Sequence, residues 1–186
     1  MYILNQFKKS AKELSHPYSL CAIGMLLALR IVLGYFGNLT LAFAPSMKFG
    51  FAFIPLMLAC IMYGPVAGAC VGGLGDIISY ILSPQGAYFP GFTISGILTG
   101  ILFGLFLYKN NCTIVRLLIS YVINAVFIHI FLGTLWLNIA FGLPFLITLG
   151  TRALQALILA VPEILITLTL AKAVTRIPQI KAIKNK

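Results

Sequence analysis

The sequence predicts an all-α integral membrane protein, a compact bundle of six transmembrane helices. Of the 186 residues, 61% are hydrophobic and only 9% are charged, and the mean hydropathy is +1.05. Soluble domains carry roughly 25% charged residues, so this chain lacks the polar surface that a water-soluble fold needs. Its apolar stretches also have the length of membrane spans, because a helix needs about 20 apolar residues to cross a ~30 Å hydrocarbon core.

Six apolar stretches follow one another along the chain. We expect spans near 17–36, 49–64, 65–82, 92–108, 114–136 and 147–174. The second and third are separated only by Tyr63-Gly64-Pro65, where a glycine corner and a proline in the first helical turn predict a tight hairpin. We therefore divide the chain into an amphipathic segment over 1–16, a six-helix transmembrane domain over 17–174 and a basic tail over 175–186.

The N-terminal segment places Ile3, Phe7, Ala11 and Leu14 at helical spacing, with lysines elsewhere around the turn. This pattern predicts a short amphipathic helix on the inner membrane surface, and a disordered tail is the alternative. The apolar run over 18–36 is longer than the roughly 7–15 residues of a signal peptide and contains Arg30. We expect it to be the first retained helix.

Positive charge is concentrated on one side of the expected spans. With the N-terminus inside, ten basic residues fall on the cytoplasmic side and only Lys48 falls in an external loop. The ten are Lys8, Lys9, Lys12, Lys109, Arg116, Lys172, Arg176, Lys181, Lys184 and Lys186. This asymmetry predicts that both termini are cytoplasmic and that the basic tails contact anionic lipid head groups. It argues against nucleic-acid binding as the reason for the net charge of +10.

Away from the span ends, four charged residues lie inside the expected spans, where each costs roughly 2.5–3.5 kcal/mol on insertion scales. Arg30, Asp76 and Arg152 all fall in the outer half of the membrane, at a level that a cavity open to the outside could reach. We interpret them as the polar anchors of an external pocket; the alternative is that Asp76 only neutralises one arginine. Glu163 lies about three turns deeper, beside Pro162, and we expect it to be structural.

The external connections over 37–48, 83–91 and 137–144 are rich in glycine, proline and aromatic residues, and loops on a rigid scaffold often carry function. Aromatic residues near them predict a stacking surface or an interfacial belt. These candidates are Phe43, Phe49, Phe51, Tyr88, Phe89, Phe92 and Trp136, with Pro90-Gly91 between the loop aromatics. Asn124 and Gln155 are hydrogen-bonding candidates for a ligand or for a neighbouring helix.

Small residues recur every fourth position in three spans. The series are Gly24 and Ala28; Gly64, Gly68 and Gly72; and Gly96, Gly100 and Gly104. Such faces let helix backbones approach closely. They predict either packing inside the bundle or docking on a partner membrane protein.

Signatures of enzymes and metal sites are missing from the sequence. The four cysteines show no CxxC spacing, which argues against a metal site or a disulfide framework, and His16 and His129 stand alone. There is no HExxH motif and no phosphate-binding glycine loop. We expect no catalytic residues, no metal and no cofactor. If the protein moves a ligand uphill, another subunit must supply the energy.

Several segments together resemble the S components, the substrate-capturing membrane subunits of energy-coupling factor (ECF) vitamin transporters, and most closely the folate-specific FolT family. The resemblance covers nearly the whole chain. One departure is that the first-span pair reads Gly24/Ala28, where S components typically show Ala-xxx-Ala. The matching segments are Ala28-Leu29-Arg30-Ile31, Met62-Tyr63-Gly64-Pro65, Gly75-Asp76, Ser83-Pro84-Gln85-Gly86-Ala87-Tyr88-Phe89-Pro90-Gly91-Phe92, Thr151-Arg152 and Pro162-Glu163.

The resemblance implies a pocket that is closed by external loops and binds folate with high affinity. Asp76 would accept hydrogen bonds from the pterin edge, the loop aromatics would stack on the ring, and Arg30, Lys48 and Arg152 set against Asp76 would leave a formal +2 for the dianionic glutamyl tail. The full expected set is Arg30, Lys48, Phe49, Asp76, Tyr88, Phe89, Pro90, Phe92, Asn124, Trp136, Arg152 and Gln155.

The resemblance also implies partners in a bacterial plasma membrane: a membrane-embedded coupling subunit and two cytoplasmic ATPases. The small faces Gly24, Ala28, Gly64, Gly68 and Gly72 would dock on the coupling subunit, and the protein would topple in the membrane to release its ligand inside. Alternatives are an S component for riboflavin, thiamin or a pyrimidine precursor, a small enzyme acting on lipid, and a purely structural membrane subunit.

Overall fold

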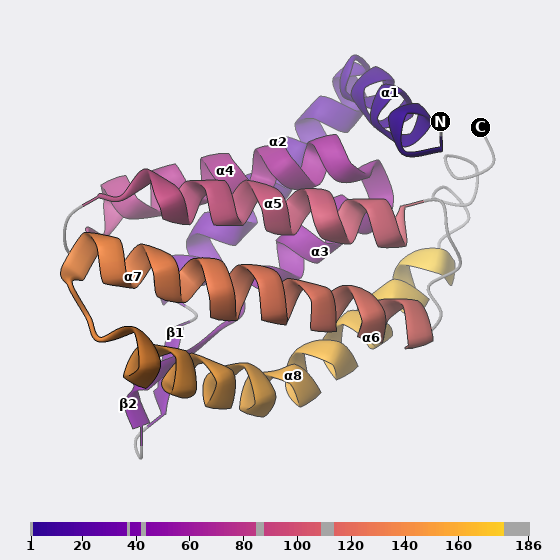
Figure 1. The fold of residues 1–186 in the computed structure, drawn as a ribbon. Helices are drawn as coiled ribbons and strands as arrows, with labels where there is room; N and C mark the ends of the chain where they lie inside the picture. Colours follow the sequence, from indigo (N-terminus) through magenta and orange to yellow (C-terminus); the bar gives the residue numbers. More distant parts are fainter. Residues whose placement is uncertain (1, 37, 42–43, 85–87, 109–113, 177–186) are drawn as a thin grey trace.

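The computed structural model describes residues 2–36, 38–41, 44–84, 88–108 and 114–176, and the side chains of 6–36, 50–84, 88–108 and 114–172 within them. Figure 1 shows a helical bundle with a small β-hairpin at its lower edge. In chain order the elements are α1 (Tyr2–Leu14), α2 (Pro17–Phe36), β1 (Asn38–Leu41), β2 (Ala44–Gly50), α3 (Phe53–Tyr63), α4 (Pro65–Leu82), α5 (Pro90–Leu107), α6 (Ile114–Ile123), η1 (Asn124–Leu132), α7 (Gly133–Phe141) and α8 (Phe145–Arg176).

The described helices have the lengths that a membrane protein requires. Five helical segments are long and apolar enough to cross a membrane: α2, α4, α5, the continuous run of α6, η1 and α7, and α8. The remaining apolar helix, α3, has 11 residues and is shorter than the roughly 17–25 residues of a span. The helical membrane architecture is therefore confirmed. The tail over 177–186 lies outside the described residues.

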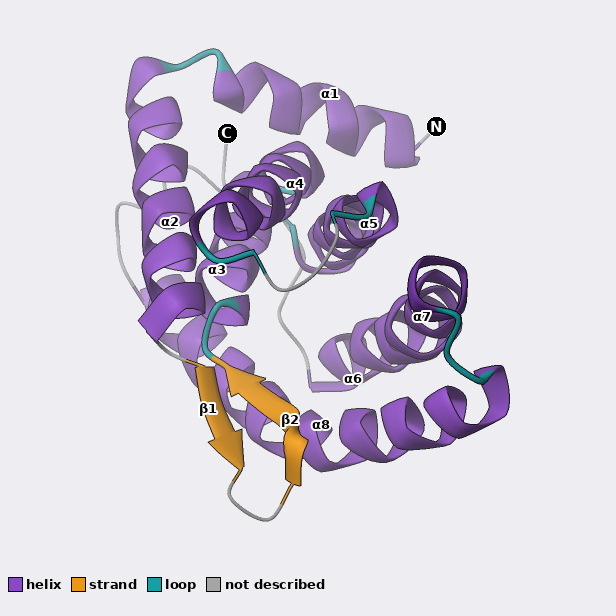
Figure 2. Cartoon of the chain, turned by 90° about the vertical axis from the view of Figure 1, so that its left-hand side faces the viewer, coloured by secondary structure: helices purple, strands orange, loops and turns teal. Residues whose placement is uncertain are grey.

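The chain between α2 and α3 forms an antiparallel hairpin, where the sequence analysis expects a loop over 37–48 and a helix from 49. Residue pairs run from Asn38 opposite Gly50 to Leu41 opposite Ala44. Pro45 and Gly50 disfavour a helix over this stretch, because proline removes a backbone donor and glycine costs helix stability. The helix therefore begins only at Phe53, and the hairpin projects from the bundle in both views (Figures 1 and 2).

Two glycine stripes hold α4 and α5 together. Gly64, Gly68 and Gly72 of the α4 stripe are buried. A Cβ at Gly64 would meet Tyr108 and Ser10, one at Gly68 would meet Gly100, and one at Gly72 would meet Gly96. A Cβ at Gly68 would lie 2.6 Å from the carbonyl oxygen of Gly100, so the two backbones are in direct contact. The expectation that this stripe docks on a partner subunit is therefore wrong, because α5 and α1 already cover it.

The remaining small pair faces outward. Gly24 and Ala28 of α2 are exposed, and a Cβ at Gly24 would meet nothing within 4 Å. Large apolar side chains on the same helix, among them Met25 and Val32, are also exposed. This side of α2 is free to contact lipid or another membrane protein.

The core sits where α3, α4 and α5 meet, and α1 is fixed across it. Buried side chains there include Cys60, Tyr63, Val71 and Phe103. The fully buried Ser10 of α1 donates a hydrogen bond to the carbonyl oxygen of Tyr63 at 2.6 Å and accepts one from the backbone N–H of Val66 at 3.2 Å. Ser10 thus bridges the corner between α3 and α4, where Gly64 has a φ of +86°.

Candidate ligand-binding site

A cavity of about 340 Å³ lies inside the bundle, with walls from α2 to α8 and from η1. Polar side chains converge on it from separate parts of the sequence: Arg30 from α2, Asp76 from α4, Asn124 from η1, and Arg152 and Glu163 from α8. Apolar side chains supply the rest of its lining, including Phe53, Leu56, Met57, Phe92 and Phe103. A mostly apolar hollow with a few convergent polar groups is the usual form of a small-molecule site.

The side chain of Arg30 extends from α2 towards α4 and passes over Gly75, which has no side chain. A Cβ at Gly75 would lie 2.6 Å from Nε of Arg30, so only glycine leaves room for the guanidinium beside Asp76. Nη1 of Arg30 is buried and has no hydrogen-bond partner in the part of the chain that the structure describes. Buried polar atoms are paired as a rule, so this N–H marks a place where a ligand acceptor would be bound.

Asp76 is held by a short chain of hydroxyl groups at the start of α5. The buried Thr93 donates a hydrogen bond to Oδ2 of Asp76 at 2.7 Å, and the hydroxyl of Tyr88 lies 2.9 Å from the same threonine oxygen. A hydroxyl group has one proton, so Tyr88 must be the donor to Thr93. The carboxylate is thus oriented by Thr93 of α5 and, through it, by Tyr88, which lies just before that helix.

Three aromatic rings pack together beside this chain. The Phe89 ring centroid lies 5.5 Å from that of Trp136 and 6.1 Å from that of Phe92. The indole N–H of Trp136 donates to the hydroxyl of Ser95 at 3.0 Å, and both Phe92 and Ser95 line the cavity. The cluster joins the start of α5 to α7, and Phe92 is its one member in the cavity wall.

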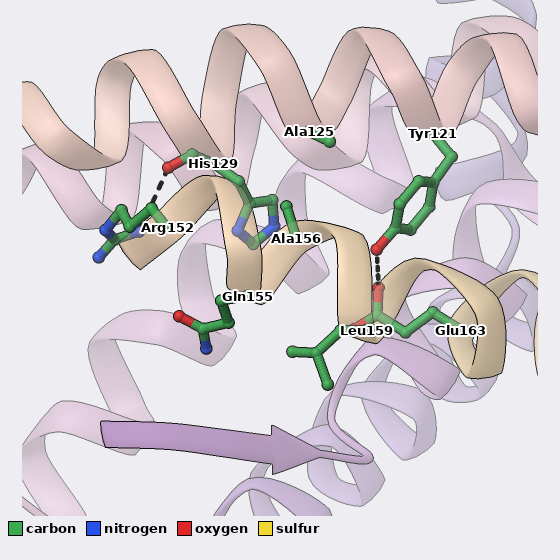
Figure 3. Close-up of a pocket in the computed structure, with 8 residues that line it drawn as sticks. All are labelled: Tyr121, Ala125, His129, Arg152, Gln155, Ala156, Leu159 and Glu163. Atoms are coloured by element: carbon green, nitrogen blue, oxygen red, sulfur yellow. Dashed lines mark hydrogen bonds between the residues drawn. The ribbon is translucent and has the colours of Figure 1, made fainter. Parts of the chain in front are cut away.

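A second pocket of about 260 Å³ adjoins the cavity between η1 and α8 (Figure 3). The two share Tyr121, His129, Arg152 and Glu163. At one end Nη1 of Arg152 donates to the carbonyl oxygen of His129 at 3.3 Å; at the other the Tyr121 hydroxyl donates to Oε2 of Glu163 at 2.7 Å. Gln155 and Leu159 lie between these two ends on α8.

The middle of the fifth span is a π-helix, which places its polar residues on the cavity. Nine residues of η1 adopt this conformation, whereas most π-helices are single turns and are frequent at functional sites. Asn124 and His129, five residues apart, both line the cavity, as expected for a helix bonded from i to i+5. Oδ1 of Asn124 is buried and finds no hydrogen-bond partner among the described side chains and backbone.

Five of the expected site residues line the main cavity: Arg30, Asp76, Phe92, Asn124 and Arg152. Gln155 lines the second pocket. The others surround this set without lining it: Tyr88, Phe89 and Trp136 lie in the adjoining contacts, and Pro90 is the exposed first residue of α5. The side chains of Phe43, Lys48 and Phe49 are outside the part of the chain that the structure describes.

Glu163 was expected to be structural, and the structure places it in the wall of both hollows. It lies eleven positions after Arg152, which is about three helical turns, so both project from the same face of α8. This spacing in the sequence could have predicted that Glu163 lies in the same wall as Arg152. With Glu163 included, the described lining carries two arginines and two carboxylates, whose formal charges cancel. The formal +2 expected from Arg30, Lys48 and Arg152 against Asp76 is therefore not found in the described lining.

Four further residues at the site are not among those expected from the sequence: Thr93, Ser95, Tyr121 and His129. Tyr121 stands three residues before Asn124, so the helical period could have predicted it on the same face. No pattern marks the two hydroxyl residues of α5, whose roles depend on the position of α4 and α7. Across the described residues, no group of three His, Cys, Asp or Glu is arranged to hold a metal ion.

Comparison with known proteins places this architecture in one family. Residues 19–180 match the family described as "ECF transporter, substrate-specific component". The Folate transporter FolT of Clostridium novyi (strain NT) is 32% identical over 115 residues, which cover 62% of this chain and 67% of that protein. The Folate transporter FolT of Leuconostoc mesenteroides is 29% identical over 91 residues, 49% of this chain and about half (47%) of that protein.

A solved structure, "Crystal structure of FolT bound with folic acid", has the same fold. It superposes with a TM-score of 0.76 at 28% sequence identity, covering 85% of this chain and 95% of that one. Together with the family match over most of the chain, this gives the assignment. The chain belongs to the family of substrate-specific components of ECF transporters.

Proposed function

We propose that this protein captures folate from outside the cell and is the substrate-binding S component of an ECF-type importer. Two relatives are described as folate transporters, and the fold matches that of a FolT bound with folic acid. The observation that carries the proposal is the cavity itself, in which Arg30 and Asn124 present buried polar atoms without partners.

The chemistry of the wall suits a flat, hydrogen-bonding ring joined to an anionic tail. Phe92, in contact with Phe89, offers an aromatic surface. Arginine binds carboxylates with a planar fork of donors, and Arg30 and Arg152 supply two such groups. Asp76 and Glu163 are the acceptors available for ring N–H groups.

The proposed partners follow from the family and from one exposed surface. S components work with a membrane-embedded coupling subunit and two ATPases, and the outward side of α2 around Gly24 and Ala28 is free for such a contact. We place the protein in a bacterial plasma membrane with both termini inside. Six membrane-embedded helices, with α3 as the short one, complete the arrangement, and toppling of the bundle would release the ligand inside.

The proposal is tested with the purified chain alone in detergent, without ATP. Isothermal titration should give saturable binding of folate and no comparable binding of riboflavin or thiamin. Preference for another vitamin would keep the class and overturn the specificity. Absence of binding for all of them, from protein that is folded by its helical circular dichroism, would overturn the proposal.

A matched pair of ligands tests the role of Arg152. Arg152→Ala should weaken folate binding by about 1.5–3 kcal/mol, the cost of a lost charged hydrogen bond, and should weaken binding of a tail-less pterin much less. Equal losses for the two ligands would contradict the assignment of Arg152 to the tail.

A further inference from the structure

Glu163 is a carboxylate in the cavity wall with one oxygen held in place and the other available. Tyr121 donates to Oε2 at 2.7 Å, and Oε1 has no hydrogen-bond partner among the described residues. Figure 3 shows the pair across the pocket between α6 and α8. Charge-assisted hydrogen bonds to such an oxygen are roughly twice as strong as neutral ones. The geometry therefore presents a fixed acceptor to whatever fills the pocket.

The other carboxylate of the wall has different surroundings. Asp76 lies beside the Arg30 guanidinium and receives Thr93, so a cation already offsets its charge. In the described part of the chain no cation lies within 4 Å of Glu163. A carboxylate taken out of water without a cation is costly, and a ligand with several N–H donors would offset that cost. Glu163 is thus the better acceptor for a donor-rich group.

The positions of Glu163 and Arg152 make the two ends of the pocket chemically different. Arg152 is eleven residues earlier on the same face of α8, about 16 Å away along a helix that rises 1.5 Å per residue. His129 lies at the Arg152 end, and Tyr121 lies at the Glu163 end. The two ends of this wall therefore carry opposite charges. An elongated molecule with a donor-rich ring at one end and a carboxylate at the other matches that pattern in only one orientation.

We propose that the captured ligand lies along α8, with the N–H edge of its ring on Glu163 and its carboxylate tail at Arg152. Glu163, oriented by Tyr121, is then a specificity-determining residue. This inference rests on the proposed capture of folate and names which carboxylate reads the pterin edge. The reversed orientation of the ligand is disfavoured, because its anionic tail would meet Glu163 and like charges in contact repel.

The test uses the purified full-length chain and three ligands: folate, pteroate, which lacks the glutamate, and p-aminobenzoylglutamate, which lacks the pterin. Glu163→Gln keeps an oxygen acceptor for Tyr121 and turns an amide N–H towards the ring donors. It should weaken folate and pteroate by about 10- to 100-fold, the range for a lost charged hydrogen bond. It should leave p-aminobenzoylglutamate within about twofold. Arg152→Gln should produce the opposite pattern.

Two further variants make the result interpretable. Glu13→Gln is a matched control, because Glu13 accepts a hydrogen bond from Tyr108 as Glu163 does from Tyr121, but it lies on α1 away from the cavity; it should not change any of the three affinities. Tyr121→Phe removes only the orienting hydroxyl and should weaken the two pterin ligands alone, so it gives the answer if Glu163→Gln does not fold.

The outcomes separate the inference from the proposed function. If wild-type protein binds folate and the Glu163 and Tyr121 variants weaken all three ligands alike, or none, the orientation along α8 is wrong and folate capture stands. If wild-type protein binds none of the three ligands, the proposed function fails, and the inference fails with it. Loss confined to the pterin ligands supports both.

Discussion

The contact between α4 and α5 allows a prediction whose size follows from the structure. Gly68→Ala places a Cβ 2.6 Å from the carbonyl oxygen of Gly100 and 2.5 Å from Sγ of Cys60. Ordinary contacts begin at 3.4 Å, so the helices must separate by about 3.4 − 2.6 = 0.8 Å or distort. Overpacking of this kind costs about 1–3 kcal/mol.

The matched control is Gly24→Ala on the outward side of α2, where the new methyl group would meet nothing within 4 Å. Both substitutions replace glycine by alanine within a helix, so the intrinsic helix preference of about 1 kcal/mol is common to them. The difference between the two variants therefore isolates the contact. Gly68→Ala should be less stable than Gly24→Ala by about 1–3 kcal/mol.

Thermal unfolding of the detergent-solubilised proteins, followed by circular dichroism, measures the difference. With about 2–4 °C per kcal/mol for a chain of this size, the Gly68 variant should unfold about 2–12 °C below the Gly24 variant. Equal midpoints would refute the close packing of α4 on α5. A Gly24 variant that unfolds first would show that the outward face of α2 has been assigned to the wrong side.

Three further predictions concern single contacts. Thr93→Val removes the hydroxyl that donates to Asp76 and should weaken folate binding by about 1.5–3 kcal/mol; an unchanged titration would contradict the orienting role. Ser10→Ala should lower the free energy of unfolding by about 1–3 kcal/mol, since a buried bridge is lost, and should speed proteolysis of α1; wild-type cleavage rates would argue against it. Burial and the hydrogen bond to Glu13 raise the pKa of Tyr108, so the folded state keeps this proton longer than the unfolded state does. Stability should then fall as the pH rises above about 10, less steeply in Tyr108→Phe, and equal slopes for the two proteins would count against this effect.

The helices and the tight corner between α3 and α4 could be predicted from local signals. The corner at Gly64 and Pro65 depends on backbone preferences that act over a few residues, and α4 begins at Pro65 as expected. The burial of Arg30, Asp76 and Arg152 at one cavity followed from their depth in the spans and from the cost of charge in lipid. These inferences needed no knowledge of which helices are neighbours.

The features that sequence reasoning missed depend on neighbours. Whether the Gly68 stripe faces a partner or α5 is decided by the position of α5, because a small-residue face serves both purposes. The π-helix of η1 has no marker in its sequence, and it moves Asn124 and His129 onto the same wall. The role of Thr93 is likewise set by where α4 brings Asp76.

The most direct test of the ligand-binding cavity uses the single tryptophan, Trp136, which packs on Phe89 and bonds to Ser95 at the cavity wall. Purified protein without ATP is titrated with folate while the tryptophan emission is recorded, for the wild type and for Arg30→Met. We expect saturable quenching at one folate per chain, with affinity at least about tenfold weaker in the variant because a charged hydrogen bond is lost. Emission that does not saturate, or equal affinities in the two proteins, would contradict a site built around Arg30.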